Sequence, residues 1–175
     1  MEPAIFIVSG IPGAGKTTVS GLLARRFDRG VHLEADIFQK LIVTGGLFPN
    51  EEPKDEAWRQ LRLRSKHVGM LADSFLEAGF WPIIDDVVVG LRLLDVLEDI
   101  KSRPLYFVLL LPRLDVVEQR DRAREEKHVF DIWSYLDRVA RTETPKQGLW
   151  LDSSDMTAEE TVDEILRRRD EALLD

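Results

Sequence analysis

The chain contains no cysteine, and this absence excludes several classes of chemistry. Disulfide bonds, thiol nucleophiles and cysteine-ligated zinc sites are impossible, and the composition suits a reducing compartment such as the cytosol. Histidine is also scarce. The three histidines are scattered along the chain, without the spacing that a histidine-ligated metal site needs.

Long apolar runs are missing as well. A helix needs about 20 consecutive apolar residues to span a bilayer. The nearest approach, residues 80–89, is interrupted by two adjacent aspartates. No basic segment precedes a long apolar run at the N-terminus, so we expect no signal peptide. These observations predict a cytoplasmic protein without a membrane partner.

Positive charge is in deficit, since 32 acidic residues outweigh 24 lysines and arginines and the formal net charge is −8. An acidic protein repels nucleic acid at long range, so we expect no general nucleic-acid binding, although a local basic cleft would still be compatible with this charge. The balance of 44% hydrophobic and 32% charged residues is that of a globular protein. The length predicts a single domain, residues 1–175, with a sizeable core.

The chain does contain a glycine-rich stretch near its start. Residues 10–17 read Gly-Ile-Pro-Gly-Ala-Gly-Lys-Thr and match the P-loop pattern G-x-x-x-x-G-K-[ST] at every fixed position. An apolar, β-branched run precedes them at residues 4–9, and apolar residues at helical spacing follow over 18–27. The alternative is an ordinary glycine turn, which would match by chance in roughly one chain in a few hundred.

Each residue type in this stretch has a chemical reason. Gly10, Gly13 and Gly15 let the backbone approach phosphate oxygens where a Cβ would clash, and the following helix adds unpaired N–H groups. Lys16 would reach the β- and γ-phosphates of ATP, and the Thr17 hydroxyl would hold Mg²⁺. The predicted nucleotide-binding residues are Gly10, Ile11, Pro12, Gly13, Ala14, Gly15, Lys16, Thr17 and Thr18.

Strands and helices alternate along the rest of the chain. We expect strands over residues 31–34, 81–88, 104–111 and 148–151, and helices over residues 37–43, 54–78, 91–100, 114–125 and 132–141. A last helix opens with a capping box at residues 157–160. This alternation predicts an α/β fold whose parallel sheet is covered by helices on both faces.

Acidic residues follow two of the predicted strands, and ligands of open α/β sheets bind at the carboxyl ends of strands. Asp85 and Asp86 end the third strand and resemble the acid that orients Mg²⁺ through water, although the sequence leaves open which of the two faces the metal. The alternative is that they cap the next helix. Asp36 follows the second strand and could be the general base that accepts a proton from an attacking hydroxyl, or the cap of a helix that begins at Ile37.

Two basic stretches complete the list of candidates. Arg120 and Arg124 share one face of a predicted helix and could clamp the transferring phosphate as part of a mobile lid. The alternative is a solvated face, because acidic residues are interleaved with them. The second stretch, residues 59–67, lies on the long helix, where some side chains could line an acceptor pocket and most would face solvent.

With these residues located, the chain resembles the chloramphenicol phosphotransferase-like family of small P-loop kinases, and more distantly zeta toxins, gluconate kinases and adenylate kinases. The resemblance is carried by residues 10–17, by Asp36 and by the Ile-Ile-Asp-Asp-Val of residues 83–87. It implies a three-layer P-loop NTPase fold with a five-stranded parallel sheet in the order 2-3-1-4-5. It also implies ATP as donor, Asp36 as base and arginines around 120–124 as a lid.

The sequence therefore predicts a kinase that uses ATP and Mg²⁺ to phosphorylate a hydroxyl of a small metabolite or antibiotic. The acceptor and lid regions would be residues 37–80 and 113–141. Two alternatives stay open. One is a kinase of a nucleotide sugar or a nucleic-acid end, and the net charge of −8 argues against the nucleic-acid version. The other is a nucleotide-binding regulator that hydrolyses ATP slowly or not at all.

Overall fold

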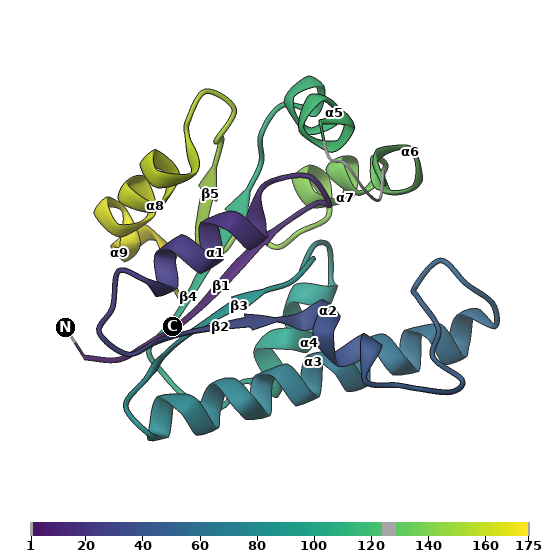
Figure 1. The fold of residues 1–175 in the computed structure, drawn as a ribbon, viewed down its shortest axis with the longest axis horizontal. Coiled ribbons are helices and arrows are strands. Elements are labelled where there is room, and N and C mark those ends of the chain that lie inside the picture. Colours follow the sequence, from purple (N-terminus) through teal and green to yellow (C-terminus); the bar gives the residue numbers. More distant parts are fainter. Residues whose placement is uncertain (1, 124–128, 175) are drawn as a thin grey trace.

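The computed structural model describes residues 2–123 and 129–174, and a twisted sheet forms its centre (Figure 1). The parallel strands are β1 (Ile5–Gly10), β2 (Gly30–Glu34), β3 (Trp81–Asp85), β4 (Leu105–Leu110) and β5 (Leu149–Leu151). Their order is β2-β3-β1-β4-β5, which confirms the predicted order. A short strand that the sequence did not predict, β6 (Leu173–Leu174), pairs antiparallel with the start of β4.

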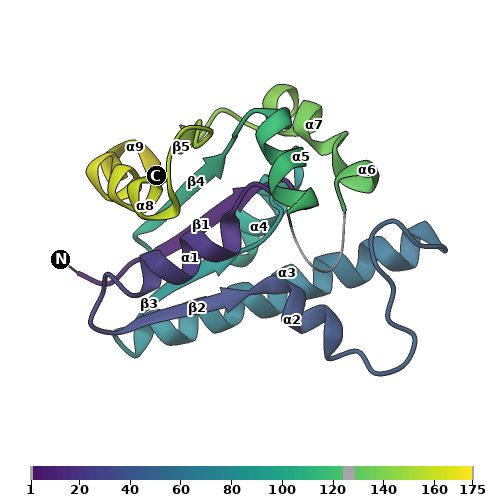
Figure 2. The same ribbon diagram turned by 45° about the horizontal axis from the view of Figure 1, so that its top comes forward.

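Helices cover both faces of this sheet, as predicted (Figures 1 and 2). One layer contains α1 (Lys16–Ala24), α8 (Ala158–Arg167) and α9 (Arg169–Ala172), and the other contains α3 (Lys54–Glu77) and α4 (Arg92–Asp99). The remaining helices gather around the carboxyl end of the sheet (Figure 1): α2 (Ala35–Lys40), α5 (Leu114–Arg122), α6 (Phe130–Trp133) and α7 (Leu136–Thr142). None of the described helices is long and apolar enough to cross a membrane.

The core follows from the composition of the central strands. All six residues of β1 are buried, and so are five of the six residues of β4. Parallel strands with helices on both faces lose contact with water on both sides, which is why these segments read as continuous apolar runs. Strand β1 pairs with β3 on one side and with β4 on the other, so the loop that follows it starts at the centre of the sheet.

Several predicted boundaries differ from the structure, and three of the differences concern the elements around the carboxyl end of the sheet. The third strand ends at Asp85 rather than at residue 88, because the backbone N–H and carbonyl of Val88 bond to the Ser9 hydroxyl instead of continuing the backbone pairing with β1. The helix predicted over 37–43 starts at Ala35, because β2 runs into it without a loop. The helix predicted over 132–141 is divided into α6 and α7 by Ser134 and Tyr135.

Candidate functional site

The glycine-rich loop joins β1 to α1 at the carboxyl edge of the sheet (Figure 1). Gly13 and Gly15 have φ angles of +91° and +95°, which side-chain-bearing residues rarely adopt. A Cβ at Gly13 would lie 2.8 Å from Val117 Cγ1, and a Cβ at Gly10 would lie 2.8 Å from the Leu110 carbonyl oxygen. Both the backbone conformation and the available space therefore require glycine in this loop.

The start of α1 offers donors to an anion. Gly15 is the N-cap residue, no described side chain caps the helix, and its first turn contains no acidic residue. The positive end of the helix dipole therefore has no acidic side chain in the first turn to offset it. The Lys16 ammonium folds over the loop and donates to the Ile11 carbonyl oxygen at 3.2 Å, while Thr17 and Thr18 are exposed. Such a helix start is suited to a phosphate group.

A cavity of about 350 Å³ lies beside this loop. Its walls come from the loop, from α1, from Arg120 on α5 and from residues 153–161. Arg120 spans the edge of the cavity, since its guanidinium donates to the Ala14 carbonyl at 3.4 Å and to the Ser153 carbonyl at 3.1 Å. The volume is that of a small-molecule site.

The predicted capping box forms one wall of the cavity. The Thr157 hydroxyl accepts from the Glu160 backbone N–H at 3.2 Å, and the Thr157 N–H donates to the Glu160 carboxylate at 2.8 Å. These reciprocal bonds fix the start of α8. The start of α8, which lies across the cavity from the glycine loop, is therefore fixed by hydrogen bonds between its own residues.

Asp36 lies in the first turn of α2, directly after β2, with 66% of its side chain exposed. The interpretation of Asp36 as the cap of a helix beginning at Ile37 is wrong, because α2 begins at Ala35 and Glu34 is the N-cap residue. Arg64 of α3 donates to Asp36 Oδ1 at 3.0 Å. The carboxylate thus lies at the carboxyl edge of the sheet and is held by one buried guanidinium.

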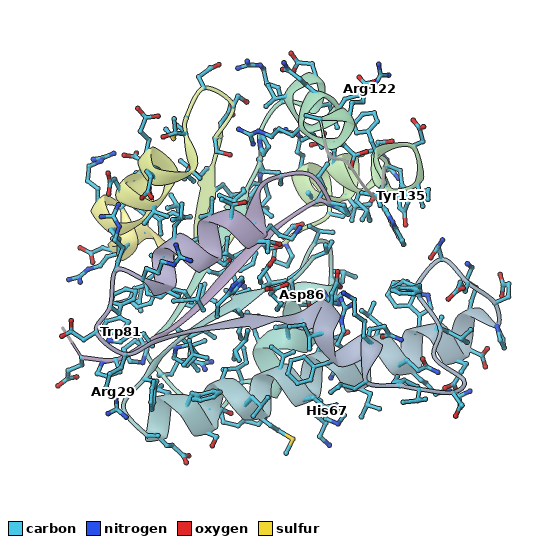
Figure 3. The ribbon with its side chains drawn as sticks, in the orientation of Figure 1. Arg29, His67, Trp81, Asp86, Arg122 and Tyr135 are labelled. Atoms are coloured by element: carbon cyan, nitrogen blue, oxygen red, sulfur yellow. The ribbon has the colours of Figure 1, made fainter. Side chains whose placement is uncertain are left out.

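Asp86 is enclosed by two arginines. Its Oδ1 accepts from Arg64 Nη2 at 2.7 Å and its Oδ2 accepts from Arg92 Nη2 at 2.6 Å. Burial by itself raises the pKa of Asp86, but Arg92, Arg64 and the hydrogen bonds outweigh burial, so this pKa lies below its ordinary value. Figure 3 shows Asp86 at the carboxyl end of the sheet, near α2.

Asp85 has different surroundings although it is also buried. His32 Nε2 lies 3.6 Å from Asp85 Oδ2, and among the described residues it is the basic group within ion-pair distance of this carboxylate. Neither aspartate caps the next helix, because α4 begins at Arg92 with Leu91 as its N-cap residue. Within residues 2–123 and 129–174, no cluster of three or more His, Asp or Glu side chains could hold a metal ion by itself.

Sequence reasoning did not single out Arg64 or Arg92. Arg64 belongs to the basic stretch 59–67, but unlike its charged neighbours it is only 6% exposed. It lies on the helical stripe of Leu61 and Val68, which are both buried. A charged residue on an otherwise apolar stripe is the signal that could have identified it. Arg124, the second predicted lid arginine, lies outside the described residues.

The chain is similar to known proteins in its first third and in its overall fold. The family model described as Zeta toxin matches residues 1–58, a stretch that contains the glycine loop and Asp36. No curated protein matches the chain. The family match thus covers the first third of the chain, and the rest is compared through its fold.

Solved structures share the fold over nearly the whole chain. A sugar kinase from Janibacter sp. HTCC2649 is 22% identical, with 97% of this chain and 96% of that chain covered and a TM-score of 0.69. The APS kinase of Mycobacterium tuberculosis, solved with AMPPNP and APS, is 15% identical, with coverage of 95% and 96% and a TM-score of 0.69. The tunicamycin resistance protein of Deinococcus radiodurans is 17% identical, with 99% of both chains covered and a TM-score of 0.67. The family match over residues 1–58 and the shared fold together confirm the resemblance to P-loop kinases of the zeta-toxin-like group.

Proposed function

We propose that this protein is a phosphotransferase that uses ATP and Mg²⁺ to phosphorylate a hydroxyl of a small molecule, such as a metabolite or an antibiotic. The observation that carries the proposal is Asp36, a carboxylate held by Arg64 at the same edge of the sheet as the glycine loop. A protein that only binds a nucleotide needs the loop but has no chemical need for this carboxylate.

For the donor half, the loop amides and Lys16 would hold the phosphates, and the cavity of about 350 Å³ would receive the nucleoside. Arg120 lines that cavity, so we assign it to nucleotide binding. The APS kinase that shares this fold is described with bound AMPPNP, which supports ATP as the donor. We also propose, from the sequence, that Arg124 clamps the moving phosphate.

The residues beside the loop fit a magnesium ion. The Thr17 side chain is exposed at the start of α1, and Asp85 has no arginine or lysine within ion-pair distance among the described residues. Sites that hold Mg²⁺ with nucleotides use few protein ligands and several waters. We therefore propose Thr17 and Asp85 as the protein groups for Mg²⁺, and Asp86 as the anchor of Arg64 and Arg92. When bound, Mg²⁺ would offset the charge that develops on the phosphate oxygens.

In the proposed reaction, the acceptor hydroxyl oxygen attacks the γ-phosphorus of ATP. The bond between this phosphorus and the β,γ-bridging oxygen breaks, and ADP leaves with the electron pair. Asp36 takes the proton of the hydroxyl, and the Lys16 ammonium stabilises the charge on the phosphates. The products are ADP, the phosphorylated acceptor and a proton.

The test is an ATP-consumption screen followed by mass spectrometry of the product. Sugars and antibiotics come first, because a sugar kinase and a tunicamycin resistance protein share the fold, and nucleotide sugars test the second hypothesis. A product heavier by one phosphoryl group supports the proposal. A protein that binds ATP but transfers phosphate to none of the acceptors would instead be a nucleotide-binding regulator.

The acceptor found in the screen then tests Asp36. We expect Asp36→Asn to bind ATP as before and to lower turnover by about 10²-fold or more. Asp55→Asn is the matched control, because Asp55 is exposed in the first turn of α3 as Asp36 is in that of α2. Unchanged turnover in the Asp36 variant would remove this residue from the mechanism.

A further inference from the structure

We propose that Arg64 is a positioning residue that holds the Asp36 carboxylate in the orientation needed to accept a proton. This inference rests on the proposed function, because it gives Asp36 the role of general base. Arg64 acts through Asp36 in this proposal, and the evidence is the way that the two side chains are joined.

The guanidinium of Arg64 connects an exposed carboxylate to a buried one. Its Nη1 donates to Asp36 Oδ1 at 3.0 Å, and its Nη2 donates to Asp86 Oδ1 at 2.7 Å. The Arg64 side chain is 7% exposed, whereas that of Asp36 is 66% exposed. A planar, buried guanidinium has little freedom to move, so it can fix the rotamer of a side chain that would otherwise turn freely in water.

The buried end of Arg64 is itself held from several directions. Asp86 Oδ1 also accepts the Val87 backbone N–H at 2.8 Å, and Asp86 Oδ2 accepts Arg92 Nη2 at 2.6 Å. The same Arg92 nitrogen donates to Ser65 Oγ at 2.7 Å. These partners come from the end of β3, from α4 and from α3. The position of the Arg64 guanidinium is therefore fixed by contacts from the sheet and from two helices. Because Arg64 also binds Asp36, the position of Asp36 depends on the same contacts.

Stability alone is a weak reason for this network. Buried ion pairs often contribute no more than apolar side chains of similar volume would. Among the residues that the structure describes, the buried Arg64 Nε atom has no hydrogen-bond partner, which adds a further cost. The network does fix the orientation of the Asp36 carboxylate. Oδ1 of Asp36 is engaged by Arg64, so Oδ2 is the oxygen left to accept the proton of the acceptor hydroxyl.

The first measurement needs neither ATP nor an acceptor. Three-bond N–Cγ couplings in NMR spectra report the χ1 rotamer of Asp36, and they should show one rotamer in the unaltered protein and rotamer averaging in Arg64→Met. The control is Arg62→Met, because Arg62 pairs with Asp95, Glu98 and Asp99 along α4 and does not contact Asp36. Arg62→Met should leave the Asp36 couplings unchanged.

The second measurement is a double-mutant cycle on MgATP hydrolysis with water as acceptor. Arg64→Met should lower phosphate release by about 10²-fold, since misplacement of a catalytic group by about 1 Å has effects of this size. If Arg64 acts through Asp36, the double variant with Asp36→Asn should be no slower than Asp36→Asn alone. The affinity for ATP should stay the same in all three variants.

Several outcomes would overturn the inference. A single Asp36 rotamer in Arg64→Met would do so, and so would a double variant whose loss equals the product of the two single losses. If Arg64→Met does not fold, Arg64→Lys retains a charge beside Asp86 without the two-pronged guanidinium, and rotamer averaging is expected there too. Full hydrolysis by Asp36→Asn would instead refute Asp36 as base, while the NMR couplings would still test the contact.

Discussion

Asp85 and Asp86 are identical in type and adjacent in sequence, yet their surroundings give them different chemistry. Two guanidinium groups occupy both oxygens of Asp86, whereas Asp85 lies near a single histidine. An aspartate whose oxygens are already engaged by arginines has little capacity left for a metal-bound water. This difference is why the proposed magnesium site uses Asp85.

At the scale of the residue, Arg120 is predicted to contribute to the affinity for ATP. Its position on the cavity wall leads us to expect that Arg120→Ala raises the Kd for a fluorescent ATP analogue by about 10-fold, or about 1.4 kcal/mol. Turnover at saturating ATP should stay near its original value. The control is Arg122→Ala, because Arg122 is exposed and pairs with Glu118 of the same helix. A variant that binds ATP normally but turns over slowly would favour the phosphate clamp that the sequence alone predicted.

The glycine loop between β1 and α1 could be predicted because its residues are contiguous. The glycines of the loop, Lys16 and Thr17 all lie within residues 10–17, so the pattern can be recognised without any long-range contact. Arg64 is different, since its partners Asp36 and Asp86 are 28 and 22 residues away along the chain. Contacts of this kind depend on how α3 packs against the sheet, and the residue pattern along a single helix does not show that packing.

At the scale of the elements, length decided what the sequence could reveal. The 24-residue helix α3 was predicted to within one residue of its ends, because many turns repeat the same apolar spacing. Strand β6 has two residues, too few for any alternation to be recognised. The strand order came from family resemblance, since an alternation of strands and helices is compatible with several orders.

The junction of β3, α3 and α4 at Asp86 predicts a specific response to acid. The pKa of Asp86 is lowered on folding, so its ion pairs stabilise the protein above the unfolded-state pKa of about 3.9. This contribution disappears as the pH falls through the folded-state pKa. Asp86→Asn should cost about 3–5 kcal/mol at neutral pH, because it leaves the buried guanidinium groups of Arg64 and Arg92 without the charge of Asp86.

Urea unfolding of both proteins at a series of pH values measures this effect. The difference in free energy of unfolding should be constant from about pH 7 to pH 5 and should shrink below about pH 4. Asp170→Asn, at an exposed position of α9, should give no difference at any pH. If the difference in free energy of unfolding between the Asp86 variant and the original protein stayed unchanged in acid, the lowered pKa of Asp86 would be contradicted.

At the scale of the whole molecule, a ligand that binds only the folded chain must stabilise it. With MgATP about 100-fold above its Kd, the gain should be about 2.7 kcal/mol. For a chain of this length that corresponds to a rise in Tm of about 5–10 °C. Lys16→Met should abolish most of this rise, because Lys16 lies over the glycine loop.

Differential scanning fluorimetry with and without MgATP makes this measurement. Lys66→Met is the control, because Lys66 is exposed on α3, and its thermal shift should equal that of the original protein. A thermal shift that survives in Lys16→Met would place ATP binding outside the loop.

The central position of β1 also has a consequence for amide hydrogen exchange. β1 pairs with β4 over all six residues and with β3 over Phe6, Ile7 and Val8, and all six residues are buried, so its amide protons should exchange only when the whole sheet opens. Asp36, in contrast, lies on α2, which is six residues long and can open locally. Binding of the donor and binding of the acceptor should therefore slow amide hydrogen exchange in different segments of the chain. ATP would slow exchange over residues 10–18, and a bound acceptor would slow it over residues 35–60.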